Sequence, residues 1–60
     1  MERLTDYVLV RPEPVHELYE VEGYVGTERV QVLGSIQWDS AEECTVLLAG
    51  CDRYLLVNPA

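Results

Sequence analysis

The sequence predicts an all-β fold, either a small five-stranded antiparallel meander or a partly open barrel. Three observations support it: alternating side chains flank a central Gly26-Thr27 pair, an apolar run at 7–10 ends before two prolines, and two more apolar runs follow Ser40. Alternation with a period of two is typical of a half-buried strand. Sixty residues leave room for one domain, residues 1–60, and for no second core.

The first predicted strand is the apolar run Tyr7–Val10. Pro12 and Pro14 follow it, and proline has no N–H to donate to a neighbouring strand. The strand is therefore expected to end, or to become an edge, at these prolines.

The central element is a β-hairpin that turns at Gly26-Thr27. Glycine readily adopts the positive φ of the first central position of a type II′ turn. One face of the ribbon then carries the pairs Val25–Glu28, Gly23–Val30, Val21–Val32, Tyr19–Gly34 and Val15–Trp38. The other face carries Tyr24–Arg29, Glu22–Gln31 and His16–Gln37. The first face is mostly apolar and the second mostly polar, as a half-buried ribbon requires.

Residues 14–22 also allow a helix, with Pro14 in its first turn and Gly23 beyond its end. This alternative would remove the pairing of Tyr19 with Gly34, in which an aromatic ring covers a strand glycine. The hairpin is therefore the preferred interpretation.

The C-terminal third allows two interpretations. As strands, Cys44–Ala49 and Tyr54–Val57 form a hairpin around Cys51-Asp52. As one short helix at 41–49, Ser40 caps the start, Glu43 completes a capping box and Gly50 ends the helix. The run 45–48 is apolar on every side, so periodicity does not decide between them. With strands, the element count is similar to that of Src-homology-3-like folds, a similarity of architecture that carries no function.

Both faces of this C-terminal hairpin would be apolar. One face holds Val46, Leu48, Leu55 and Val57, and the other holds Leu47, Ala49, Tyr54 and Leu56. An exposed sheet face is normally polar, so either the first strand closes the barrel over one face or a second protein covers it. We expect a homodimer or partner interface that uses Leu47, Tyr54 and Leu56.

Candidate catalytic and metal-binding residues are few. Zinc sites usually have four ligands, often in close Cys pairs, whereas Cys44 and Cys51 are seven residues apart and His16 is distant. His16 lies beside Glu17, but no nucleophile motif accompanies them. We expect no enzyme activity, no metal and no cofactor, with reduced cysteines in or near the core. Trp38 is expected in the core too, because the chain has no Phe.

The formal charge of −7 argues against direct nucleic-acid binding, since phosphate contacts rely on Arg and Lys. The N-terminus does not resemble a signal peptide, and no apolar stretch is long enough to cross a membrane, so a cytoplasmic location is expected. The acids are dense between residues 13 and 28, where Glu17, Glu20 and Glu22 form a candidate docking stripe.

These features predict a small acidic protein–protein interaction or regulatory module that is not an enzyme and that self-associates. Its expected contacts are the stripe of Glu17, Glu20 and Glu22 and the apolar C-terminal face. The alternative is an acidic decoy that imitates nucleic acid and inhibits a host nucleic-acid-binding protein. Binding by a decoy should weaken steeply with salt, whereas an apolar interface should not respond in this way.

Overall fold

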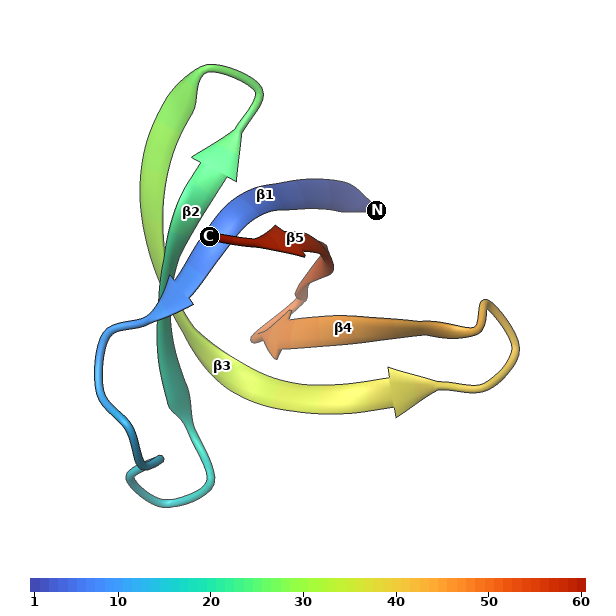
Figure 1. The fold of residues 1–60 in the computed structure, drawn as a ribbon. Helices are drawn as coiled ribbons and strands as arrows, with labels where there is room; N and C mark the ends of the chain where they lie inside the picture. The colour runs from blue at the N-terminus through green and yellow to red at the C-terminus, as the bar shows by residue number, and fades with distance from the viewer.

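All regular structure in this protein is β-strand, as seen in a computed structural model that describes residues 1–60. The strands are β1 (Glu2–Leu9), β2 (Tyr19–Val25), β3 (Glu28–Asp39), β4 (Cys44–Ala49) and β5 (Asp52–Pro59). They form a closed barrel in sequence order (Figure 1). The predicted five-stranded all-β fold is confirmed, and neither of the alternative helices forms.

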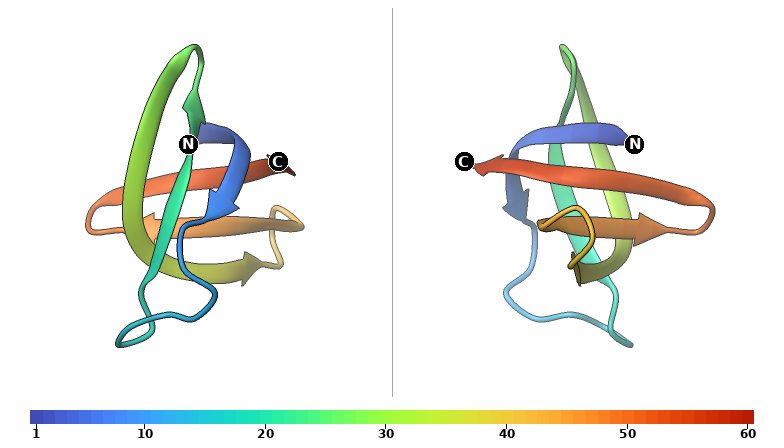
Figure 2. Two further views of the ribbon diagram at one scale, coloured as in Figure 1. Left: turned by 60° about the vertical axis from the view of Figure 1, so that its left-hand side comes forward. Right: turned by 90° about the vertical axis from the view of Figure 1, so that its right-hand side faces the viewer.

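Closure of the barrel brings β1 beside β5. In an antiparallel meander of five strands the first and fifth strands run in the same direction, so their pairing has to be parallel. Leu4 lies opposite Leu56 and Arg3 opposite Leu55. The right-hand view of Figure 2 shows the two strands running side by side toward the C-terminus of β5.

The central hairpin has the predicted register from its turn outward. Val25 pairs with Glu28, Val21 with Val32 and Tyr19 with Gly34. Gly26 has a φ of 64°, whereas Thr27 is not among the residues with positive φ. This combination is the one that a type II′ turn requires.

The hairpin ends at the Tyr19–Gly34 pair, so the predicted pairs Val15–Trp38 and His16–Gln37 are wrong. Beyond Gly34, β3 leaves β2 and pairs with β4 instead, with Trp38 opposite Thr45. Figure 1 shows β3 as the long curved strand that follows β2 first and β4 afterwards. A β-carbon on Gly34 would lie 2.3 Å from the carbonyl oxygen of Leu48, so this close approach admits only glycine.

Residues 15–18 form a separate tight turn instead of continuing the ribbon. The backbone groups of Val15 and Leu18 exchange two hydrogen bonds, both of 3.0 Å. His16 and Glu17 between them have φ values of 52° and 65°. Positive φ at both central positions is the mark of a type I′ turn.

The first strand is longer than predicted and begins at Glu2 instead of Tyr7. Its polar first half is recruited because it has partners on both sides, β2 and β5. The strand ends before Pro12, as expected. A bulge at Asp6, which has a φ of 50°, separates the two parts of its pairing with β2.

The C-terminal hairpin turns at Gly50-Cys51 and not at the predicted Cys51-Asp52, since Ala49 pairs with Asp52. Gly50 has a φ of 63° and occupies the first central position of the turn, where a positive φ favours glycine. The register therefore differs by two residues from the prediction. A shift of two leaves every side chain on the face that was predicted for it.

The core cluster consists of Leu4, Val21 and Leu47, which have no exposed surface, with apolar side chains from β1, β2, β3 and β5 packed against it. Tyr54 and Leu56 belong to this packed set. The predicted contact of Leu47, Tyr54 and Leu56 with a partner stays a prediction; within the chain, all three belong to the core or pack against it. They face the barrel interior because β1 closes over them, which was one of the two covers expected for an apolar face.

Candidate functional site

The outer face of β3, β4 and β5 carries the second apolar set of the C-terminal hairpin. Val46 and Leu48 alternate with the inward Leu47 and therefore point away from the core. Val46 is only 2% exposed even so, and Leu48 is half-buried. Something on the outer surface must cover Val46.

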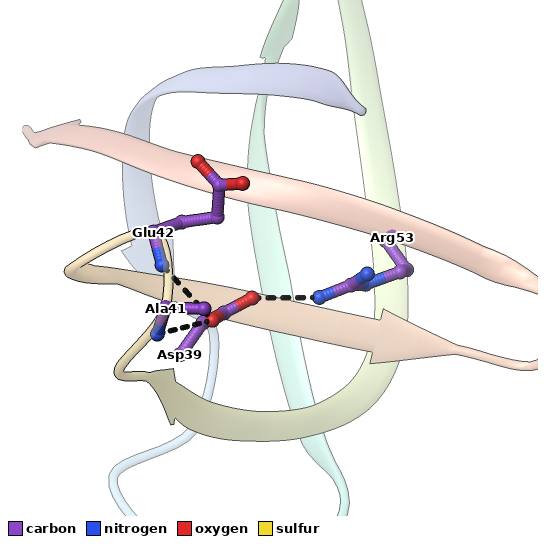
Figure 3. A network of polar contacts seen from close by, with 4 residues as sticks. All are labelled: Asp39, Ala41, Glu42 and Arg53. Atoms are coloured by element: carbon purple, nitrogen blue, oxygen red, sulfur yellow. Dashed lines mark hydrogen bonds and ion pairs between the residues drawn. The ribbon is translucent and has the colours of Figure 1, made fainter.

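An ion pair between Asp39 and Arg53 spans this face. Asp39 ends β3 opposite Cys44, and Arg53 lies on β5 opposite Leu48, so the pair crosses β4 at the level of Val46. Arg53 Nη2 donates to Asp39 Oδ2 at 2.9 Å, across the strand drawn behind them in Figure 3. Gln37 and Leu55 are the residues paired with Val46 on the two neighbouring strands, so the ion pair and these neighbours share this part of the outer face.

The Asp39 carboxylate also organises the loop between β3 and β4. Its Oδ1 accepts hydrogen bonds from the amides of Ala41, at 3.0 Å, and Glu42, at 3.2 Å (Figure 3). The bond from the Glu42 amide is the main cause that lowers the pKa of Asp39, and the Ala41 amide and Arg53 act in the same direction. The ionised carboxylate of Asp39 thus connects the β3–β4 loop to Arg53 on β5.

A groove of about 500 Å³ runs along this face beside Trp38. Its lining includes Gln37, Trp38, Asp39, Val46, Leu48 and Arg53. We call it the Trp38 groove. It combines apolar side chains with polar groups, and both kinds are available to a bound segment.

Trp38 is 65% exposed, so its predicted place in the core is wrong. Its position explains the exposure, because it lies near the end of β3, beyond the point where β3 leaves β2. The strand there has a partner on one side only, β4, and the closed barrel provides no interior for the ring.

Three carboxylates are close in sequence to lining residues of the Trp38 groove. Glu42 and Glu43 follow Ser40 in the β3–β4 loop, and Asp52 lies between Cys51 and Arg53 and lines a separate hollow with Met1 and Glu2. All three are exposed, and none takes part in an ion pair. The field of these acids reaches Cys44, whose pKa is raised by burial first and then by the charges of Asp39 and Glu42.

The predicted acidic stripe is only partly assembled. Glu20 and Glu22 do share the outer face of the hairpin, but each has a basic partner. Arg11 Nη2 lies 3.1 Å from Glu20 Oε1, and Arg29 Nη2 lies 2.6 Å from Glu22 Oε1. The hydrogen bond to Glu22 raises the pKa of Arg29, and Gln31 donates a further bond to Glu20.

Glu17 is separated from the other two acids, because it lies in the turn of residues 15–18. It lines a smaller hollow of about 340 Å³ together with Pro14, Tyr19 and Gln37. Gln37 also lines the Trp38 groove, so the two hollows share this residue. Glu17 is therefore not part of the stripe.

The sequence analysis did not identify Trp38, Asp39 and Arg53 as a site. One local signal was present: Asp39-Ser40 directly after Trp38 is typical of a turn, which places the tryptophan at a strand end. The contact between Asp39 and Arg53 has no such signal, because it depends on the order of three strands.

Cys44 and Cys51 are both free and lie near opposite ends of β4. The structure contains no group of three or more His, Cys, Asp or Glu side chains arranged to hold a metal ion. It also contains no helix long and apolar enough to span a membrane.

The Trp38 groove and the carboxylates near its lining are thus the features from which a function can be inferred. Comparison of the chain with models of known protein families, with curated proteins and with solved structures finds no match.

Proposed function

We propose that this protein is a small acidic interaction module, not an enzyme, that docks one segment of a protein partner in the Trp38 groove. The observation that carries this proposal is the exposure of the only tryptophan in the chain beside a groove with apolar walls. Tryptophan is strongly enriched among residues that dominate binding energy at protein interfaces.

The cost of this exposure supports a binding role. Burying a large apolar side chain contributes roughly 1.5–3 kcal/mol, and a domain of this size has a total stability of about 5 kcal/mol. An exposed tryptophan forgoes a large part of what the core could gain. Docking of a partner would recover that contribution at the interface.

The alternative function, a decoy that imitates nucleic acid, is less well supported. Such a decoy needs a row of unneutralised negative charges along one face. Glu20 and Glu22 on the outer face of the hairpin are instead paired with Arg11 and Arg29. These pairs interrupt the row where the sequence predicted it.

The experiment compares two immobilised baits, the wild type and Trp38→Ala, in lysate of the native host. Proteins retained by the wild type and lost from Trp38→Ala are the expected partners, and they should elute over a broad salt range. Trp38 contributes little to the core, so the variant should keep the wild-type circular dichroism spectrum.

Tyr24→Ala is the matched control, because Tyr24 is an exposed aromatic residue on β2, outside the lining of the groove. It should retain the same proteins as the wild type. Identical retention by all three baits would contradict the proposed function. Elution of every protein in a narrow window at low salt would favour the decoy.

A further inference from the structure

We infer that the Trp38 groove takes a cationic, extended peptide segment, with an arginine side chain stacked on the indole of Trp38. This inference rests on the proposed function and names the chemistry of the partner. It is carried by the distribution of charge, the exposure of Trp38 and the residues that line the groove.

The protein holds its own positive charges in internal pairs. Three of its four arginines form ion pairs with Glu20, Glu22 and Asp39, and Arg3 is the exception. Eight of its eleven acids have no such partner. A ligand therefore meets a surface on which almost all unneutralised charge is negative.

Four of these acids lie near lining residues of the Trp38 groove. Glu42 and Glu43 are in the loop that follows Ser40, Asp52 is next to Cys51 and lines a separate hollow, and Glu17 lines the hollow that shares Gln37. The one cation of the lining, Arg53, is held by Asp39. A basic segment lying in the groove would place positive side chains near acids that have no other partner.

The indole of Trp38 favours arginine among the basic residues. A tryptophan face attracts cations, and the planar guanidinium stacks on it while keeping its N–H groups available for carboxylates. Glu42 and Glu43 follow Trp38 by four and five residues in the same loop region. An arginine on the indole can thus be held by the ring and by a carboxylate together.

The lining of the groove indicates which residues accompany the arginine in the bound segment. Leu48, which is half-buried, offers apolar contact in the lining, whereas Val46 is almost fully covered, so a segment in which apolar and basic residues alternate fits the groove better than a purely basic one. A second copy of this chain is a poor occupant. Its net charge is −7, and Arg3 is its only arginine outside an ion pair.

The direct test uses defined peptides and the fluorescence of Trp38, which is the only tryptophan in the protein. The probe is an acetylated and amidated pentapeptide, Arg-Val-Arg-Val-Arg. Its matched controls replace every arginine with lysine, with the neutral isostere citrulline or with glutamate. We expect a saturable change of emission with the arginine peptide, several-fold weaker binding of the lysine peptide, and no saturation with the other two.

Variants locate the binding, measured by polarisation of a fluorescein-labelled arginine peptide. Trp38→Ala should weaken binding about tenfold or more. The double variant Glu42→Gln/Glu43→Gln should weaken it several-fold and reduce its dependence on salt. Tyr24→Ala and Glu28→Gln remove an aromatic ring and a charge outside the groove, so they should bind as the wild type does.

Three results would overturn the inference. The first is equal binding of the citrulline peptide, and the second is undiminished binding by Trp38→Ala. The third is a dimer, seen by light scattering, that Trp38→Ala abolishes, because the occupant would then be a second copy. Suppose that lysate proteins are retained by the wild type and lost from Trp38→Ala while the arginine peptide leaves the emission of Trp38 unchanged. In that case the proposed function stands and the inference of a cationic ligand is wrong.

Discussion

Asp39 connects more of the structure than any other polar side chain in the protein. Its two oxygens hold the amides of Ala41 and Glu42 and the guanidinium of Arg53. One carboxylate therefore holds the β3–β4 loop and the guanidinium of Arg53, and both Asp39 and Arg53 line the Trp38 groove. An exposed ion pair alone contributes little to stability. The hydrogen bonds that the same carboxylate accepts from the two loop amides are therefore the larger part of the contribution of Asp39.

The pKa of Asp39 predicts how its contribution depends on pH. Its folded pKa is lowered below 3.8, so the folded state binds the proton less readily than the unfolded state does. The stabilisation is therefore complete above the unfolded pKa and is lost as the pH falls through the folded value.

We expect Asp39→Asn to melt below the wild type at pH 7, with a difference that shrinks toward pH 2. Thermal unfolding followed by circular dichroism between pH 7 and pH 2 measures it. Glu28→Gln, which removes an exposed charge without an ion pair, separates the effect of net charge from that of the Asp39 contacts. A difference that stays constant down to pH 2 would show that the charge of Asp39 is not what stabilises the loop.

The two cysteines should differ in reactivity. The pKa of Cys44 is raised by burial and by nearby carboxylates, so less of it is the reactive thiolate, whereas Cys51 is exposed in a turn. With a thiol reagent such as Ellman's reagent at pH 8, one thiol should react quickly and one slowly. The fast phase should disappear in Cys51→Ser and remain in Cys44→Ser, and the reverse assignment would contradict this arrangement.

Among the elements, β3 decides the architecture, because one strand serves two partners. Residues 28–34 pair with β2, and residues 35–39 pair with β4. The change of partner falls beside Gly34, where the backbone of Leu48 comes closest.

Gly34→Ala should be strongly destabilising. A methyl group there would meet a backbone oxygen, which cannot rotate away as a side chain could. Overpacking of this kind costs typically about 1–3 kcal/mol, a large fraction of a total near 5 kcal/mol. Urea unfolding followed by the fluorescence of Trp38 measures the loss.

Gly50→Ala is the matched control for that substitution. Gly50 has a positive φ but open space around it, so alanine there should cost only the backbone strain of about 1 kcal/mol. The Gly34 variant should be the less stable of the two. The opposite order would mean that the strands separate easily at Gly34 and that the close approach does not constrain the fold.

At the scale of the whole molecule, charge repulsion opposes a well-connected barrel. The molecule measures 26 × 26 × 21 Å, while the screening length is about 30 Å at 0.01 M salt and about 3 Å at 1 M. At low salt every unpaired acid therefore acts on every other. The parallel pairing of β1 with β5 has to hold the ends of the chain together against this repulsion.

The melting temperature should therefore rise when NaCl is increased from 0.01 M to 0.5 M, although the three ion pairs weaken. Scanning calorimetry at both concentrations measures the change, and KCl at the same ionic strength checks that screening is responsible. A melting temperature that falls with salt would mean that the ion pairs of Arg11, Arg29 and Arg53 outweigh the repulsion.

The free protein should be a monomer of 6.8 kDa in light scattering at micromolar concentration. The sequence predicts a homodimer because an apolar face needs a cover, and β1 supplies that cover within one chain. Raising the salt removes the repulsion between copies, so the mass should be measured at low and high salt. A mass twice as large under both conditions would restore the homodimer hypothesis.

The sequence by itself determined the parts of this protein that depend on neighbours along the chain. The turn at Gly26-Thr27, the register of β2 with β3 as far as Gly34, and the span of β4 all follow from a turn residue and an alternating pattern. These are local signals, and each can be recognised without knowing what lies across the barrel. The two apolar faces of the C-terminal hairpin were also evident, even with the turn displaced by two residues.

Only the tertiary structure decided which of those faces became the core, where β3 changes partner, and that Trp38 remains in solvent. It also brought Asp39 and Arg53 together across β4. Each of these outcomes depends on the closure of β1 onto β5, which joins the two ends of the chain. No local pattern encodes that contact, because its stability comes from the packing of all five strands at once.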